Sequence, residues 1–500
     1  MSAPPLRICV VGAGITGLTA AWEVQRSAPE ADLVVLEATA RPGGVIRTSQ
    51  FAGRPVDEGA DAFLARVDDG VRLCSELGLA DDLVAPAIGR AFVYLDGALV
   101  PLPEAHFLGV PLEPEGIDGR LLSPAGVAAL RADLARGAAA PDARGSAGGR
   151  GTSDFVGIGD GTGQSPAGDA DRTIGEMVRD RLGDEVLERL VGPLVGSINA
   201  GDCDRLSLHA AAPALAEAAR TGASLITALR KRDAASCDGD GVPEPVFWGL
   251  RGGMERLTAT LAERVTSALA LGEPALALQV QPDRSGNPAV RSVDTPHRSI
   301  GCDAVVLAVG AHRSARLVEP WAPEAAALLA RTETASVAIV TLAYEMSAVP
   351  GAGAGSGFLV PPSAGLDITA CSWASTKWAH LGTGDGGTAI LRVSLGRHGD
   401  DGIVGESDEA LIGAARAGLA TVMGVSAAPV EARVSRWPGA FPQYAVGHLE
   451  RTAAVEATLG AAGAYCAGSS YHGIGIPACI GSGRRAARAA LAWASRRREP

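Results

Sequence analysis

Short apolar runs interrupted by glycines open the chain. Residues 7–11 (RICVV) have strand propensity, residues 18–28 (LTAAWEVQRSA) have helical composition, and residues 32–37 (DLVVLE) form a second apolar run that ends in Glu37. Between the first run and the helix stands a glycine-rich stretch, made of Gly12, Ala13, Gly14, Ile15, Thr16 and Gly17. This order of strand, G-x-G-x-x-G, helix, strand and acidic residue predicts a dinucleotide-binding βαβ unit.

Each conspicuous residue of this unit has a physical role. Gly12 permits the tight turn, Gly14 lets a pyrophosphate approach the backbone, and Gly17 lets the helix pack closely on the strand. The Glu37 carboxylate can accept hydrogen bonds from a ribose diol. A merely glycine-rich βα turn is the alternative interpretation.

A second glycine pair follows the acidic residue. Gly43 and Gly44 stand between Arg41 and Arg47, which predicts another nest of backbone N–H groups beside the first phosphate site. The pattern E-x3-R-x-G-G resembles FAD enzymes of the amine oxidase and phytoene desaturase type. The alternative is a Gly-Gly turn flanked by two solvated arginines.

The remaining patterns predict an α/β fold with α+β insertions. Residues 120–136 and 173–220 have helical periodicity, residues 335–346, 356–373 and 388–396 are typical of strands, and residues 406–424 of a helix. The run CDAVVLAVG at 302–310 predicts a buried strand that returns to the dinucleotide fold. Residues 137–170 are rich in Gly, Ala, Ser and Asp, which predicts a disordered insertion.

The resemblance to such FAD enzymes implies that these segments form three units. The FAD-binding domain is discontinuous and takes residues 1–90, 246–320 and 437–500. The substrate-binding domain takes residues 91–112, 221–245 and 321–436, and the helical domain takes residues 113–220, with the 137–170 insertion inside it.

The far end of the chain carries a second loop that leads into a helix. Gly473, Gly475 and Gly481 precede an Arg/Ala-rich helical stretch. FAD is long, and its isoalloxazine end needs a cradle separate from that of its ADP half. A late strand–loop–helix unit can supply backbone N–H groups and the positive end of a helix dipole to the flavin.

Composition limits the other functions. The net charge of −12 argues against a nucleic-acid binder, and the eight cysteines are scattered without a C-x-x-C pair, which indicates a reducing compartment and no metal site. No signal peptide and no apolar run of membrane-spanning length is evident. We therefore expect a cytoplasmic protein, with peripheral contact at a membrane left open.

The motifs together resemble the protoporphyrinogen/coproporphyrinogen III oxidase family of haem biosynthesis. The segments that carry this resemblance are VVGAGITGLTAAW, EATARPGGVIRT, DEGADAFL, LGDEVLERLVGPLVGSINAGDCDRLSL, GLRGGMERLTATL, WPGAFPQYAVGHL and YHGIGIPACIGSGRRAA. The resemblance implies a Rossmann-like FAD domain, a substrate domain on a mixed sheet and a mostly helical domain. It also implies non-covalent FAD, which would carry the chemistry at its N5 atom without a catalytic side chain.

The resemblance assigns cofactor contacts by position. They are Gly12, Ala13, Gly14, Ile15, Thr16, Gly17, Glu37, Ala38, Val45, Gly59, Ala60, Asp61, Ala275, Ile474, Ser482, Gly483 and Arg484. Some family members carry an Arg where Ala91 stands here, so Arg90 is the candidate substrate clamp, although a slip of one residue turns a strand side chain to the other face. Trp437, Phe441 and Tyr444 could wall an aromatic pocket or pack in the core.

The resemblance implies oxidation of a porphyrinogen in three two-electron steps, with O2 as acceptor and H2O2 as product. The Lys-poor, actinobacterial-like composition and the lack of an evident anchor favour coproporphyrinogen III over protoporphyrinogen IX. The product would pass to a ferrochelatase through transient contact. The alternatives are a flavin amine oxidase or carotenoid desaturase, and a non-catalytic FAD-bound porphyrin carrier.

Overall fold

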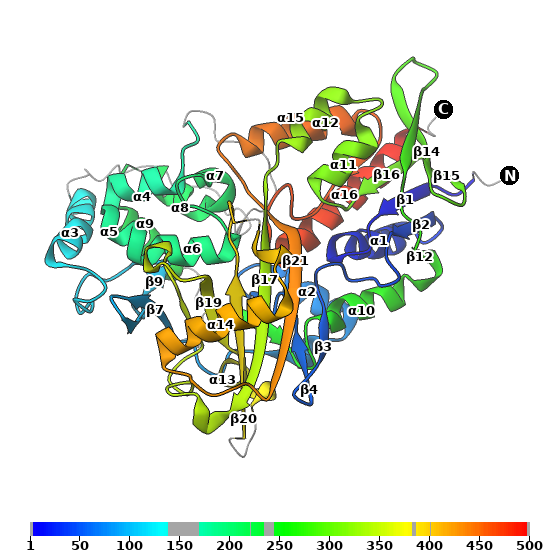
Figure 1. Ribbon diagram of the computed structural model, residues 1–500. Helices are drawn as coiled ribbons and strands as arrows, with labels where there is room; N and C mark the ends of the chain where they lie inside the picture. The colour runs from blue at the N-terminus through cyan, green and yellow to red at the C-terminus, as the bar shows by residue number, and fades with distance from the viewer. Residues whose placement is uncertain are drawn as a thin grey trace.

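The computed structural model describes residues 4–138, 170–220, 222–234, 245–382, 387–400 and 402–497. The predicted insertion at 137–170 lies outside the described residues except at its two ends. Figure 1 shows a parallel sheet with its helices at the right, a long mixed sheet through the centre and a cluster of helices at the upper left.

The parallel sheet is assembled from distant parts of the chain. Its strand order is β12-β2-β1-β16-β22, and every neighbouring pair is parallel. The strands are β1 (Arg7–Val11), β2 (Asp32–Glu37), β12 (Leu269–Leu271), β16 (Ala304–Leu307) and β22 (Ala464–Cys466). Thus strands from the start, the middle and the end of the chain meet in one sheet, and β16 is the returning strand that the CDAVVLAVG run predicts.

Helices cover both faces of this sheet, which explains its continuous apolar strands. Ile8 and Val10 face one core, and Cys9 and Val11 face the other, because successive side chains of a strand alternate. The first core is closed by α1 (Ile15–Ser27), α2 (Asp68–Leu77), α10 (Glu255–Arg264) and α16 (Ile476–Arg496). The second is closed by α11 (Ala311–Val318), α12 (Pro323–Ala330) and α15 (His448–Gly460).

Three small sheets surround this unit. They contain β3 (Thr48–Phe51) and β4 (Arg54–Asp57); β5 (Phe63–Leu64), β11 (Phe247–Leu250) and β6 (Leu83–Val84); and β13 (Ala277–Pro282), β14 (Pro288–Asp294) and β15 (Ser299–Gly301).

The mixed sheet has the order β21-β17-β20-β19-β18-β7-β8, and only the β18–β7 pair is parallel. Its strands are β7 (Ala91–Leu95), β8 (Ala98–Pro101), β17 (Thr334–Glu345), β18 (Gly357–Leu359), β19 (Ile368–Trp373), β20 (Thr388–Leu395) and β21 (Glu431–Pro442). Helix α14 (Asp408–Met423) covers one face, and the short α13 (Ala374–Lys377) follows β19.

The third unit is helical. It contains α3 (Pro124–Ala138), α4 (Ile174–Leu182), α5 (Asp184–Val186), a π-helical turn (Leu187–Val191), α6 (Gly192–Asn199), α7 (Leu208–Ala211), α8 (Pro213–Arg220) and α9 (Leu225–Ala234), beside the hairpin of β9 (His106–Phe107) and β10 (Val110–Pro111). Thr173 caps α4 through a reciprocal pair of hydrogen bonds with Glu176. Short 3-10 turns lie at Ala80–Asp82, Thr266–Ala268, Met346–Ala348, Pro362–Ala364, Ala379–Leu381 and Ile403–Gly405.

Two segments pack elsewhere than the sequence places them. Helix α9 belongs to the range 221–245, which the sequence assigns to the substrate domain, yet its Leu225, Ile226 and Leu229 are buried among the helices. Helix α12 packs on the parallel sheet and not on the mixed one. Both segments bury an apolar face, and the sequence of the segment itself does not show which distant element covers that face.

Candidate cofactor and active site

The first glycine loop shows two different uses of glycine. Gly12 has φ +101°, and a Cβ atom there would stand 2.5 Å from the Ala308 carbonyl oxygen, while a Cβ at Gly17 would stand 1.8 Å from the Gly12 carbonyl oxygen. Gly14 differs, because it has an ordinary φ of −74° and the nearest atom to its Cβ would be Gly44 Cα at 4.0 Å. The fold itself therefore requires Gly12 and Gly17, whereas Gly14 leaves space at the N-terminus of α1, where a pyrophosphate can lie.

The second glycine pair lies directly against this loop. The Gly43 N–H donates to the Ala13 carbonyl over 2.8 Å, and Gly14 and Gly43 form an isolated parallel bridge. Arg41 braces the turn, since its guanidinium donates to the Gly44 carbonyl over 2.7 Å and pairs with Glu255 at 3.1 Å. The two predicted phosphate nests thus form one continuous surface.

Glu37 lies at the carboxyl end of β2 beside the loop. Its carboxylate accepts from the Ala13 N–H at 2.9 Å and from the Thr39 N–H and hydroxyl at 2.9 and 2.8 Å. These bonds fix the acid at the sheet edge where dinucleotides bind. The same carboxylate can also accept a ribose hydroxyl, because each oxygen offers more than one acceptor site.

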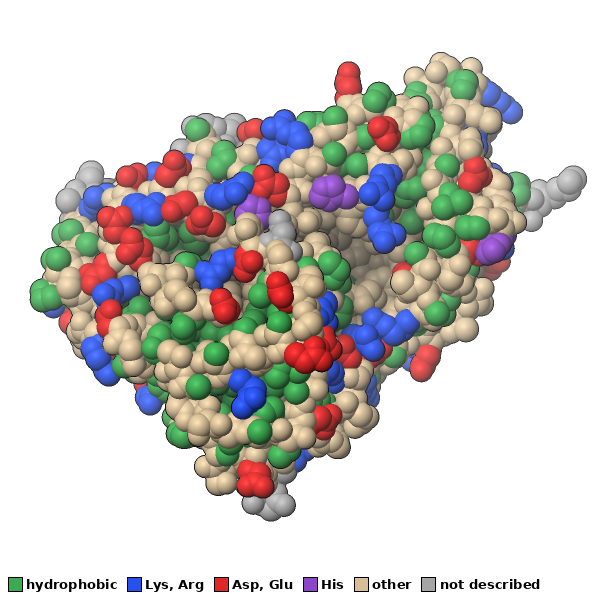
Figure 2. All heavy atoms as spheres, in the orientation of Figure 1, with side chains coloured by type: hydrophobic (Ala, Val, Ile, Leu, Met, Phe, Trp, Pro, Cys, Tyr) green, Lys and Arg blue, Asp and Glu red, His purple; other side chains and the backbone are tan. Residues whose placement is uncertain are grey.

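A cavity of about 360 Å³ opens between Glu37 and α11. It brings together four of the predicted contacts: Gly12, Glu37 and Ala38 from the first βαβ unit, and Ala275 from the segment after β12. Figure 2 shows the surface hollowed below α11. Leu276, which lines this cavity, is 58% exposed, and Val45, which follows the Gly43-Gly44 pair, is 55% exposed, values that are unusual for large apolar side chains.

The late helix α16 packs on α1, the helix that follows the glycine loop. A Cβ at Gly483 would stand 2.3 Å from the Thr16 carbonyl oxygen, so only glycine allows this close contact. Ser482 accepts from the Gly468 N–H at 3.1 Å and holds the preceding loop against the helix. Ile474 lies in that loop, and Gly475 is the N-cap residue of α16. The two chain ends therefore converge, as an FAD site with two cradles requires.

Arg484 has a structural partner on another helix. Its guanidinium is buried and donates to Glu76 of α2 over 2.9 Å. The Arg484 Nε atom is buried without a hydrogen-bond partner among the described residues, so the guanidinium keeps a donor besides the one that Glu76 accepts.

The segment from Asp57 to Asp61 joins the parallel unit to the mixed sheet. One oxygen of Asp61 lies 3.1 Å from Lys377, 3.1 Å from Arg392 and 3.0 Å from the Trp378 indole nitrogen. Burial alone would raise the pKa of Asp61, but Lys377 and Arg392 hold it well below its ordinary value. Arg392 also donates to the Gly59 carbonyl, while Ala60 is exposed.

Lys377 and Arg392 are residues that sequence reasoning missed. They stand on α13 and β20, far along the chain from the acid that they contact, and no local spacing marks them.

A second buried carboxylate, Asp57, lies near Asp61. Burial raises the pKa of Asp57 to about 6, although this carboxylate accepts from the Thr48 hydroxyl at 2.6 Å and the Met254 N–H at 2.8 Å.

The three candidate pocket aromatics do not form one wall. The Trp437 indole donates to the Glu58 carbonyl over 3.0 Å, beside Gly59. Phe441 packs with Ala200, Ala335 and Val337 at the edge of the mixed sheet. Tyr444 is buried in the helical unit's core.

Arg90 lies at the start of β7 on the surface. Its guanidinium is 3.7 Å from Glu104, and the two side chains are 56% and 93% exposed. Exposed pairs of this kind are weak, so a substrate carboxylate could displace Glu104. The role of Arg90 as a substrate clamp stays a prediction.

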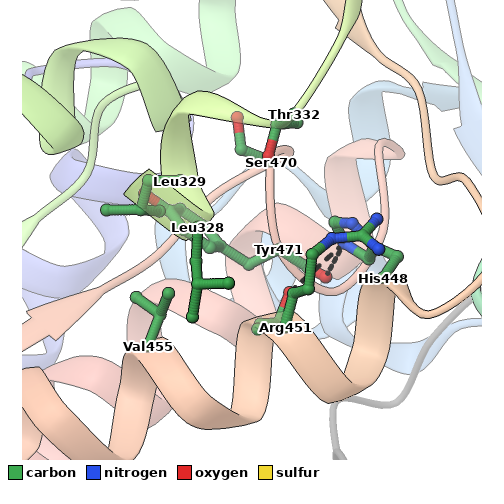
Figure 3. Close-up of a pocket in the computed structure, with 9 residues that line it drawn as sticks. Leu328, Leu329, Thr332, His448, Arg451, Val455, Ser470 and Tyr471 are labelled. Carbon is green, nitrogen blue, oxygen red and sulfur yellow. Dashed lines mark hydrogen bonds between the residues drawn. The ribbon is translucent and has the colours of Figure 1, made fainter. Parts of the chain in front are cut away.

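A second, very small cavity lies between α12 and α15. Figure 3 shows its lining residues, among them Leu328, Val455, Ser470 and Tyr471. Its volume of about 10 Å³ suits about one water molecule and no organic substrate.

Within the part of the chain that the structure describes, no helix is long and apolar enough to cross a membrane.

Comparison with known proteins shows which family the chain belongs to. A model of the flavin-containing amine oxidoreductase family matches residues 15–491. The chain is 35% identical to a coproporphyrinogen III oxidase of Mycobacterium tuberculosis over 96% of both chains, and 30% identical to one of Bacillus subtilis over 99% of both. It is also similar to a crystal structure provisionally assigned as a protoporphyrinogen oxidase from Exiguobacterium sp. 255-15, with a TM-score of 0.78, 29% identity and 98% coverage of both chains.

Proposed function

This chain belongs to the flavin-containing amine oxidoreductase family, and from that premise we propose that it is an FAD-dependent oxidase that converts coproporphyrinogen III to coproporphyrin III in haem biosynthesis. The observation that carries this proposal is the similarity to coproporphyrinogen III oxidases, at up to 35% identity over nearly the whole of both chains. The flavin site is the feature of the structure that supports it.

The cofactor fits the residues that the structure brings together. Gly14 and Gly43 would hold the pyrophosphate, and Glu37, Ala38 and Ala275 would hold the adenosine half in the cavity beside α11. This separate adenosine compartment favours FAD over FMN, which has no such half. The loop before α16 would hold the isoalloxazine end.

We propose that the flavin is bound without a covalent bond. The two cysteines nearest the late loop are Cys466 and Cys479, and both are buried. Burial raises the pKa of their thiols to about 12 and about 11, so neither supplies the thiolate that attack on a flavin would need.

The chemistry that bound FAD supplies is acceptance of a hydride from a bridging carbon of the macrocycle, while a pyrrole N–H loses a proton. The protein's contribution is to bind both partners and to orient them. Three such two-electron steps complete the porphyrin. We propose O2 as the acceptor that regenerates the oxidised flavin, and transient contact with a ferrochelatase that takes the product.

Protoporphyrinogen IX is the second candidate substrate. The assignment of the similar Exiguobacterium structure favours it, whereas the curated Mycobacterium and Bacillus relatives favour coproporphyrinogen III. The two molecules differ at two side chains, which are propionates in coproporphyrinogen III and vinyl groups in protoporphyrinogen IX. The choice therefore depends on whether cations of the chain meet the extra carboxylates.

We expect kcat/KM for coproporphyrinogen III to exceed that for protoporphyrinogen IX by about tenfold or more, because one charge-assisted hydrogen bond contributes about 1.5 kcal/mol or more. Added salt should raise KM for the tetracarboxylate more than for the dicarboxylate. The rates are compared side by side by porphyrin fluorescence, with Arg90→Gln as the first variant of a candidate clamp. A preference for protoporphyrinogen IX would overturn the substrate and leave the flavin chemistry intact.

A further inference from the structure

The segment from Gln443 to Gly447 connects the helical unit to the late loop. The Gln443 side-chain amide donates to the Asn199 carbonyl over 2.9 Å, and the Ser207 N–H donates to the Tyr444 carbonyl over 2.7 Å. The Asp171 carboxylate accepts from the Gly447 N–H at 3.1 Å. The segment is therefore held from the helical side by both side chains and backbone.

The side chain of Tyr444 holds the loop from the other direction. Its hydroxyl accepts from the Gly473 N–H at 2.8 Å and donates to the Ser469 carbonyl, so one phenol spans both limbs of the loop. Its ring stacks on His448 with centroids 4.1 Å apart, and His448 Nε2 lies 2.9 Å from the Tyr471 carbonyl oxygen. Tyr444 is only 2% exposed.

Other contacts fix the same loop to the parallel unit. The Ser470 hydroxyl accepts from the Ala311 N–H at 3.1 Å, and the Tyr471 and Ser314 hydroxyls are 2.9 Å apart. His472 lies 2.6 Å from Glu456. Tyr444 is thus the hydrogen-bonding contact of the helical unit with this loop among the described residues, beside the apolar packing of Ile474 on the same core.

We propose that Tyr444 is a positioning residue for the flavin, which sets the redox potential of the cofactor by fixing the loop that ends at Gly475. This inference rests on the proposed function, because it requires the isoalloxazine to lie at that loop. The N–H groups at the start of α16 carry positive partial charge, which favours the negative charge that the ring gains on reduction. Their distance from the ring depends on the loop that Tyr444 spans.

Tyr444→Phe keeps the ring and its stacking but removes the hydroxyl. The Gly473 N–H and the Ser469 carbonyl then lose their buried partner, and the loop must shift to find others. We expect the N–H groups to move away from the flavin, so that the reduced state binds about tenfold less tightly relative to the oxidised one. A tenfold change corresponds to a fall of about 30 mV in the two-electron midpoint potential.

The experiment measures the midpoint potential, the visible absorbance spectrum and the thermal unfolding temperature of the flavin-loaded proteins. The matched control is Tyr344→Phe, which removes the hydroxyl of an equally buried tyrosine in the mixed sheet, 1% exposed, and is expected to leave the potential unchanged. His448→Leu removes another contact of the same loop, at the Tyr471 carbonyl, and replaces Tyr444→Phe if that variant does not accumulate.

A lowered potential with a changed flavin spectrum in Tyr444→Phe, and neither change in Tyr344→Phe, supports the proposal. A lowered unfolding temperature with an unchanged potential and spectrum overturns it, because Tyr444 would then only stabilise the fold. Failure of the unmodified protein to hold any flavin is a different result, which would refute the proposed function itself.

Discussion

A Gly14→Val variant is expected to fold and to bind FAD at least about 1,000-fold more weakly, a loss of about 4 kcal/mol. The backbone of Gly14 has φ −74° and ψ −179°, which a β-branched residue adopts without strain. The nearest protein atom to a new Cβ would be 4.0 Å away, so the side chain would enter the space that the pyrophosphate needs. Flavin absorbance after gel filtration and a titration with FAD measure the effect.

Two neighbouring substitutions make this result interpretable. Gly14→Ala adds one methyl group and should weaken binding less than Gly14→Val does. Gly17→Val should instead prevent folding, because its Cβ would stand 1.8 Å from the Gly12 carbonyl oxygen. A folded Gly14→Val protein with a full complement of FAD would show that the phosphate does not lie on this loop.

Asp61→Asn is expected to destabilise the fold by about 3 kcal/mol, since it leaves Lys377 and Arg392 without the acid that they share. The pKa of Asp61 lies below its ordinary value, so its stabilisation is present at neutral pH and is lost as the pH falls below about 4. Asp61→Asn should therefore be less stable than the unmodified protein at pH 7, and its free energy of unfolding should fall less as the pH is lowered.

Denaturant unfolding at several pH values measures this loss. The control is Glu217→Gln, which breaks an exposed pair with Arg220 on one helix and should cost about 0.5 kcal/mol or less. If Asp61→Asn costs no more than Glu217→Gln, the charges around Asp61 do not hold the two sheets together.

The local parts of the site could be predicted from the sequence. The glycine loop and Glu37 follow one another within a single βαβ unit, and their roles depend on backbone geometry that the spacing encodes. The late loop before α16 could be predicted for the same reason. The meeting of Gly12 and Ala275 in one cavity came from the resemblance, because the residues around Ala275 carry no pattern that marks a contact with the glycine loop.

The contacts between units could not be predicted. Asp61 meets Lys377 and Arg392, and Tyr444 meets Gly473, across surfaces that form only when distant segments pack. A buried carboxylate or phenol signals that a partner exists, because an unpaired polar group is costly inside a protein, but it does not identify that partner. Helix α9 shows the same limit, since its apolar face suits more than one neighbour.

The most direct test of the central claim is an anaerobic titration of the flavin-loaded protein with coproporphyrinogen III. We predict that the flavin absorbance is bleached, that three equivalents of flavin are reduced for each tetrapyrrole oxidised, and that coproporphyrin fluorescence appears in step. Admission of O2 should restore the oxidised flavin and yield H2O2. A flavin that stays oxidised in excess coproporphyrinogen III and in excess protoporphyrinogen IX, with no porphyrin formed, would contradict the assignment of this chain as a porphyrinogen oxidase.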